Sequence, residues 1–202
     1  INIGIGQSYW TATPIQLTQS IATLVNKGKR IIPQIIRGNM QKDKVVLQPI
    51  KERRPIDIKD EHNWDIVLDA MYGTVNRKGP ARAAFRGANY ISAGKTGTAQ
   101  LVSIAQDEKY DASKLSKKNH DNAMYVGYAP YDKPQITVTV VLENAGHGGT
   151  EAAPIARKIM DNFFKDQTFP EHKVIEFLGQ EERELTQSER KPVVSAQPGT
   201  QL

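Results

Sequence analysis

The 202-residue sequence contains no cysteine. Disulfide bonds and thiolate metal sites are therefore excluded. The absence of cysteine does not identify the cellular compartment in which the protein acts. Long apolar runs are also missing: the longest, such as 138–142, are far below the ~20 residues that a transmembrane helix needs. The sequence shows no signal-peptide pattern, and because the first residue is Ile1 rather than Met, we expect the chain to be a piece of a longer protein.

Aromatic residues are few, at 7% of the chain, and the net charge is +5. A positive balance favours anionic partners such as a lipid surface, a cell-wall polymer or a nucleic acid. The basic residues are scattered and lack interleaved aromatics, so we expect no nucleic-acid binding. The length suits one hydrophobic core.

The most distinctive stretch is Ala-Gly-Lys-Thr-Gly-Thr-Ala-Gln at 93–100. Its glycines allow a close backbone approach, Lys95 supplies a cation, and Thr96 and Thr98 supply hydroxyls. Such a string is typical of two sites that hold an anion: a phosphate-binding loop, and the third motif of penicillin-recognising acyl transferases.

The phosphate-loop interpretation fits less well. Counting back from Gly94, Asn89 stands where the first glycine of the fingerprint belongs. A phosphate loop also needs a helix directly after the lysine, whereas Gly97 and two β-branched threonines follow here, and these favour an extended chain.

Periodicity predicts helices over 14–27 and 61–76, with one more helical turn at 81–85. Thr13, Pro14 and Gln16 form a capping-box start for the first of these. A last helix ends near Lys165. We expect these residues to face inward: Leu17, Ile21, Leu24 and Val25; Trp64, Val67, Leu68, Met71 and Val75; Ile155, Ile159, Met160 and Phe163.

Alternation predicts a β-hairpin of 123–129 and 136–143. The flanks of the glycine-lysine-threonine string are also expected to be extended, which makes an antiparallel sheet. Residues 31–37, with Pro33, are expected as an edge strand that pairs with 44–47. The basic run 51–59 is expected as surface loop.

Two polar segments complete the chain. The long loop at 106–122 is a candidate lid beside the site. After Phe169-Pro170 the sequence has few apolar residues, so we expect a flexible tail. The predicted organisation is a domain over 1–168 and a tail over 169–202.

Several segments together resemble the transpeptidase domain of class B penicillin-binding proteins, most of all the penicillin-binding protein 2 group. Gly-Gln-Ser-Tyr-Trp-Thr-Ala-Thr-Pro-Ile-Gln-Leu at 6–17 resembles the segment after the family's second motif. The strings at 93–100, 126–130 and 141–144 resemble the third-motif strand and the two strands that follow it. The resemblance covers about 1–168, in the family's order and spacing.

The resemblance implies an α+β fold, an antiparallel sheet with flanking helices like that of serine β-lactamases. It implies a serine D,D-transpeptidase that cross-links peptidoglycan stem peptides and is acylated by β-lactams. Lys95 and Thr98 would be catalytic, with the Thr98 N–H as half of the oxyanion hole. Thr96, Gly97 and Thr98 would bind substrate, the two hydroxyls holding the terminal carboxylate.

The family's Ser-x-x-Lys nucleophile motif and Ser-x-Asn motif are expected upstream of Ile1. No Ser-x-Asn occurs in the sequence. The Ser92–Lys95 match lies on the predicted strand, where residues three apart point to opposite faces. The second match, Ser188–Lys191, lies in the predicted tail. We therefore expect this chain alone to lack the nucleophile.

The resemblance further implies the periplasmic side of a bacterial inner membrane, with an N-terminal anchor. The expected partners are the upstream part of the same protein and a membrane glycosyltransferase of the elongation machinery. No metal or organic cofactor is required, and the four histidines show no paired metal spacing: His62, His120, His147 and His172. A non-catalytic scaffold of the same fold remains an alternative.

Overall fold

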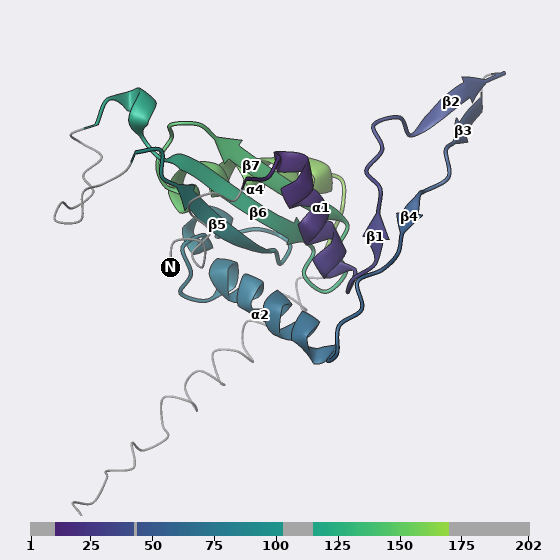
Figure 1. The fold of residues 1–202 in the computed structure, drawn as a ribbon, viewed down its shortest axis with the longest axis horizontal. Coiled ribbons are helices and arrows are strands. Elements are labelled where there is room, and N and C mark those ends of the chain that lie inside the picture. The colour runs from purple at the N-terminus through teal and green to yellow at the C-terminus, as the bar shows by residue number, and fades with distance from the viewer. Residues whose placement is uncertain (1–10, 43, 103–114, 170–202) are drawn as a thin grey trace, which may run out of the picture. The chain divides into compact units, whose positions relative to one another are not determined.

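The computed structural model describes residues 11–42, 44–102 and 115–169 (Figure 1). The chain divides into two units, Ile1–Gln167 and Thr168–Leu202. All described helices and strands belong to the first unit. The predicted tail lies, except for Phe169, outside the described residues, as do Ser188 and most of the predicted lid.

A three-stranded antiparallel sheet forms the centre of the first unit. Its strands are β5 (Ala93–Ala99), β6 (Asn122–Ala129) and β7 (Ile136–Leu142), in the order β5-β6-β7. Lys95 pairs with Val126, and Tyr125 pairs with Val140. The predicted hairpin and the predicted extended conformation of the glycine-lysine-threonine string are confirmed.

The predicted helices are present. They are α1 (Pro14–Val25), α2 (His62–Asn76), the single turn α3 (Arg82–Phe85) and α4 (Ala153–Phe164). The capping box starts α1 as predicted: the Gln16 N–H donates to Thr13 Oγ1 at 3.4 Å, and the Thr13 N–H donates to Gln16 Oε1 at 2.8 Å. A π turn, η4 (Gly148–Ala152), leads into α4, and a short 3-10 turn, η3 (Lys117–Asn119), precedes β6.

Helices cover both faces of the sheet (Figure 1). On one face α1 joins β7 through a hydrogen bond of 2.7 Å from Thr18 to Thr139. The same face carries a core cluster of Met71, Tyr72, Ala93 and Tyr128, with Ile21, Leu24 and Leu68 packed on it. On the other face the ring of Phe85 in α3 lies 5.5 Å from that of Tyr125.

The predicted inward face of α4 is wrong in phase. Only Met160 of the predicted set is buried; the other three, Ile155, Ile159 and Phe163, are 38–45% exposed. The buried residues are instead Ala153, Ala156, Met160 and Phe164. Small side chains at 153 and 156 let the helix backbone approach the sheet, and they turn the larger aliphatic residues outward. In α2, the predicted inward residue Val67 is likewise exposed.

The segment between α1 and α2 differs from the prediction. Extended structure in 31–37 stops at Ile31, which belongs to the two-residue strand β1 (Arg30–Ile31). Pro33 interrupts the run because it has no N–H for a ladder. β1 pairs with β4 (Glu52–Arg53), inside the predicted loop.

The predicted strand at 44–47 is confirmed as β3 (Lys44–Leu47), but its partner is β2 (Gly38–Gln41). The two strands form a separate two-stranded sheet.

The tightest packing in the sheet lies at Gly94. A Cβ there would overlap the hydroxyl of Tyr125, and it would stand 2.7 Å from the Val126 carbonyl oxygen. Gly127, the partner of Gly94 in the ladder, has the same neighbour: a Cβ at Gly127 would lie 2.6 Å from the Tyr125 hydroxyl. The phenol of Tyr125 therefore occupies the space that side chains at both positions would need.

We expect Gly94→Ala to lower the free energy of unfolding by about 1–3 kcal/mol, the usual cost of an overpacked core. Thermal unfolding of the purified protein measures the change. Gly73→Ala is the matched control: its Cβ meets only the Arg77 side chain, at 3.4 Å, and alanine favours the helix. Adding Tyr125→Phe to Gly94→Ala removes the overlapping oxygen and is expected to restore part of the loss. Equal stability of Gly94→Ala and the wild type would contradict this packing.

Candidate functional site

The glycine-lysine-threonine string lies on β5, at the edge of its sheet. Within the described ranges, β5 pairs with β6 on one side and has no strand on the other. Lys95 is exposed, and its Nζ donates a hydrogen bond of 2.9 Å to the Thr96 carbonyl oxygen. The motif therefore places an exposed cation on a strand that, among the described residues, lies at the edge of its sheet.

Because side chains alternate along a strand, the residues of the motif are divided between the two faces of the sheet. Lys95 and Gly97 point to one face of the sheet, and Thr96 and Thr98 point to the other. Both threonines are partly buried, and they stand on the same side as the fully buried Tyr125. The two hydroxyls are thus brought to one side, as joint binding of a single group requires.

Gly148 in η4 supports β5 from behind. A Cβ on Gly148 would overlap the carbonyl oxygens of Met124 and Gly97 and would stand 3.1 Å from the Gly97 nitrogen. The π turn therefore rests directly on the backbone of the motif strand. The paired glycines Gly148 and Gly149 are the sequence signal for such a close approach.

Ser92 and Lys95 do not form a nucleophile–base pair. Ser92 is 1% exposed, and its Oγ has no hydrogen-bond partner among the described residues. The Ser92 carbonyl accepts a hydrogen bond of 2.8 Å from Asn76 Nδ2, which holds this segment against α2. Because Ser92 is buried and Lys95 is exposed, the prediction that this match is accidental agrees with the geometry.

The residues after Lys95 also decide against a phosphate loop. They remain extended to Ala99 and pair antiparallel with β6. A phosphate loop requires a helix N-terminus at that point, since its N–H groups and dipole bind the phosphate.

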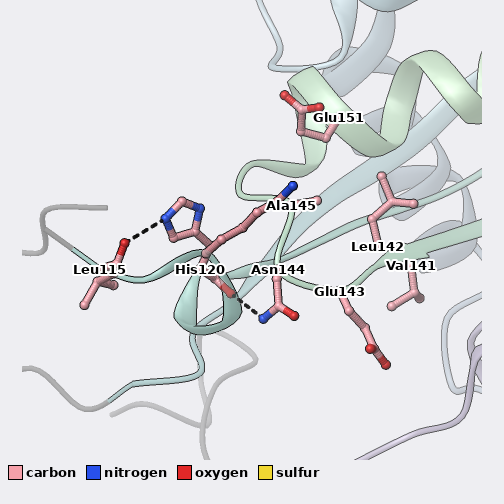
Figure 2. A pocket seen from close by; sticks show the side chains of 9 residues that line it. Leu115, His120, Val141, Leu142, Glu143, Asn144, Ala145 and Glu151 are labelled. Carbon is pink, nitrogen blue, oxygen red and sulfur yellow. Dashed lines mark hydrogen bonds between the residues drawn. The ribbon is translucent and has the colours of Figure 1, made fainter. Parts of the chain in front are cut away.

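An open pocket lies at the end of β7, where this strand leads into η4 (Figure 2). His120 and Asn144 frame it: the His120 ring lies 3.3 Å from the Leu115 carbonyl oxygen, and Asn144 Nδ2 donates to the Lys118 carbonyl at 2.8 Å. The carboxylates of Glu143 and Glu151 point in different directions (Figure 2). No cluster in the described part of the chain has three His, Cys, Asp or Glu side chains placed to hold a metal ion. None of the motif residues lines this pocket.

Buried phenols surround the motif strand. Burial raises the pKa of Tyr125 far above the ordinary value, and the neighbouring phenols of Tyr90 and Tyr128 raise it further. Burial also raises the pKa of Tyr128, with Tyr131 adding to the effect. The pKa of Tyr90 is raised by burial and by Asp161, which accepts a hydrogen bond of 2.8 Å from its hydroxyl. These phenols therefore keep their protons and stay neutral near pH 7.

An antiparallel sheet with helices on both faces and a Lys-Thr-Gly-Thr edge strand defines an α+β domain of the penicillin-recognising type. The sequence matches the penicillin binding protein transpeptidase domain family over residues 1–161. The chain therefore belongs to the penicillin-binding protein transpeptidase domain family.

Relatives with this domain are similar along most of the chain. Peptidoglycan D,D-transpeptidase MrdA of Haemophilus influenzae is 41% identical over 193 residues, which are 93% of this chain and 29% of that protein. The MrdA of Escherichia coli is 35% identical over 163 residues, 80% of this chain and 26% of that protein.

Solved structures agree. PBP2 of Pseudomonas aeruginosa, in complex with WCK 5153, matches with a TM-score of 0.65 and 35% identity, over 82% of this chain and 33% of that one. Penicillin-binding protein 2B of Streptococcus pneumoniae matches with a TM-score of 0.60 and 29% identity, over 78% and 25%. The chain thus spans about a third or less of the length of each of these relatives.

The raised phenol pKa values predict how the protein responds to alkali. Tyr90, Tyr125 and Tyr128 bind their protons more tightly in the folded than in the unfolded state. Their contribution to stability is therefore complete below the unfolded pKa of about 10 and is lost as the pH rises above it. In a spectrophotometric titration, we expect at least three of the seven tyrosines to stay un-ionised at about pH 11 until the protein unfolds. Ionisation of all seven in the folded protein would contradict these environments.

Proposed function

We propose that this chain is the C-terminal part of a serine D,D-transpeptidase that cross-links peptidoglycan. Residues 1–168 would be the domain portion and 169–202 a tail. One observation carries the proposal: Lys95, Thr96, Gly97 and Thr98 lie in order on an exposed sheet edge, in a chain that matches the transpeptidase family over 1–161.

In the proposed reaction a serine attacks the carbonyl of the penultimate D-alanine of a stem peptide. The terminal D-alanine leaves as the serine ester forms, and an amine of a second stem displaces the serine to make the cross-link. A β-lactam enters the same step, because attack opens its ring and leaves the acyl group on the serine.

The motif strand would bind the donor peptide and stabilise the charge that develops on it. An extended peptide adds to an open strand edge through main-chain hydrogen bonds. The Thr98 N–H would donate to the tetrahedral oxyanion, a contribution of about 2.7–4 kcal/mol for such a donor. The hydroxyls of Thr96 and Thr98 would hold the terminal carboxylate, Lys95 would supply positive charge, and Gly97 would allow the nucleophile to come close.

The nucleophilic serine is proposed to lie outside these 202 residues. The chain has no Ser-x-Asn motif, and Ser92, in one of its two Ser-x-x-Lys matches, is buried without access to substrate. The chain spans 29% of its Haemophilus influenzae relative, which leaves room for a first half of the site in the rest of the protein.

We further propose that the whole protein acts at the periplasmic side of the inner membrane, beside a glycosyltransferase that supplies glycan strands, and needs no cofactor. In the described part of the chain, no helix has the length and apolarity to cross a bilayer. The support for this location comes from membership of the transpeptidase family. A second candidate, a non-catalytic scaffold of the same fold, would keep the strand but would form no covalent adduct with a penicillin.

Intact-mass spectrometry of the full-length protein with and without a penicillin tests the function. We expect the mass to rise by one penicillin, on a serine that precedes Ile1. An adduct on a serine within these 202 residues would overturn the placement of the nucleophile. Absence of any adduct would overturn the transpeptidase function and favour the scaffold.

Replacing the lysine of the motif tests its role. In the full-length protein, Lys95→Ala is expected to slow acylation by a fluorescent penicillin about 10- to 100-fold, the loss of a charged hydrogen bond worth about 1.5–3 kcal/mol. Lys158→Ala, an exposed lysine on α4, is the matched control and should acylate at the wild-type rate. Unchanged acylation of Lys95→Ala, with unchanged thermal stability, would remove Lys95 from the catalytic group.

A further inference from the structure

The hairpin of β2 and β3 is a part of the molecule that the proposed function does not use. The two strands lie side by side (Figure 1), with Met40 opposite Val45 and Gly38 opposite Leu47. They pack chiefly against each other rather than against the helices and the main sheet. An isolated two-stranded sheet is at best marginally stable in water, so this hairpin lacks the cover that would stabilise it.

One face of the hairpin is apolar and uncovered. The register places Met40, Val45 and Leu47 on the same face, and they are 72%, 62% and 58% exposed. The opposite face carries Asn39, Gln41, Lys44 and Val46. The hairpin therefore has the two-sided pattern of a strand pair that covers a hydrophobic surface on one side only.

The surrounding segment is strongly basic. Between residues 29 and 54 the chain has eight Lys and Arg against two Asp and Glu, a net charge of +6, whereas the whole chain carries +5. Two of these cations have acidic neighbours: Lys29 with Glu52 at 3.0 Å, and Arg54 with Asp57 at 3.9 Å. The basic residues of the segment are Lys29, Arg30, Arg37, Lys42, Lys44, Lys51, Arg53 and Arg54.

Charge and composition select among the possible occupants of the apolar face. A second copy of the chain would bring another hairpin of the same high positive charge, and like charges in an interface are strongly unfavourable. A lipid surface is bound by basic amphipathic segments that carry large apolar anchors, with Trp and Tyr at the interface, but residues 29–54 contain neither. An acidic protein surface can do both things that the hairpin requires: its apolar side chains can cover the apolar face, and its carboxylates can pair with the basic residues.

We propose that the β2–β3 hairpin is a docking site for an acidic protein partner. Apolar side chains of the partner cover Met40, Val45 and Leu47 on one face, and its carboxylates reach around the edges of the narrow hairpin to pair with Arg37 and Lys44. The open backbone edges of the hairpin also allow a strand of the partner to extend the small sheet. This inference does not depend on the transpeptidase chemistry of β5.

Site-specific photo-crosslinking in cells that express the full-length protein tests the proposal. Val45→p-benzoylphenylalanine places the crosslinker on the apolar face, and Lys158→p-benzoylphenylalanine, at an exposed position on α4, is the control outside the hairpin. We expect one discrete protein adduct from position 45, little or none from position 158, and a net negative charge in the crosslinked segment of the partner when it is identified by mass spectrometry.

Charge reversal supplies the second arm. Arg37→Glu with Lys44→Glu is expected to lower the adduct yield from position 45 at least about tenfold, because two attractive charge pairs become repulsive. Arg37→Lys with Lys44→Arg keeps the charge and should keep the yield. Penicillin acylation should be unchanged in both variants, which separates failure of docking from failure of the enzyme.

Several results would overturn the docking site. They are no adduct from position 45, equal adducts from both positions, an adduct with a second copy of the chain, and an adduct that charge reversal leaves unaltered. Sedimentation of the protein with phosphatidylglycerol vesicles, abolished by the charge reversal, would assign the hairpin to a membrane surface instead and would likewise overturn the proposal.

Discussion

The central sheet depends on the packing of one side chain, the phenol of Tyr125, against the paired strands β5 and β6. The ring of Tyr125 lies over the paired glycines Gly94 and Gly127, and neither position has space for a side chain. Phe85 covers the same ring from α3. Because the aromatic group fills the space that two side chains would take, β5 is held to β6 at the position next to Lys95. Interiors packed to this density transmit small displacements, so the position of the motif depends on this contact.

The motif strand is therefore supported from behind and, among the described strands, lies at the edge of its sheet. β6 holds one side of it, and Gly148 of η4 rests on the backbone of Gly97. Catalysis of acyl transfer depends on donors placed in advance where charge develops, and rigid strands place such donors better than loops do. The β2–β3 hairpin is the opposite case, a pair of strands with little support from the rest of the domain. The same fold thus contains one strand that is closely packed from behind and one hairpin whose apolar face is exposed.

Much of the fold could be predicted because its signals are local. Thr13 and Gln16 start α1 through hydrogen bonds three residues apart, and alternating residues reveal β6 and β7 without knowledge of their neighbours. The buried side of α4 could not be predicted in the same way. Ile159 is more hydrophobic than Ala156, yet Ala156 is buried, since the sheet accepts a close helix backbone better than a branched side chain. The predicted partner of β3 was wrong for a related reason. Several extended segments near β3 could pair with it, and the sequence pattern does not show which of them does.

By itself, the sequence determined the order of the helices and of the central strands β5, β6 and β7, the extended conformation of the Lys-Thr-Gly-Thr string and the family to which it belongs. These follow from short-range hydrogen bonding, alternation and motif chemistry, which need only neighbours along the chain. Only the tertiary structure decided that Ser92 is buried, that Thr96 and Thr98 face the same side of the sheet as Tyr125, and that Gly148 supports the strand from behind. Each of these depends on which distant side chain occupies a given volume, and burial, unlike periodicity, is a property of the packed molecule rather than of the chain.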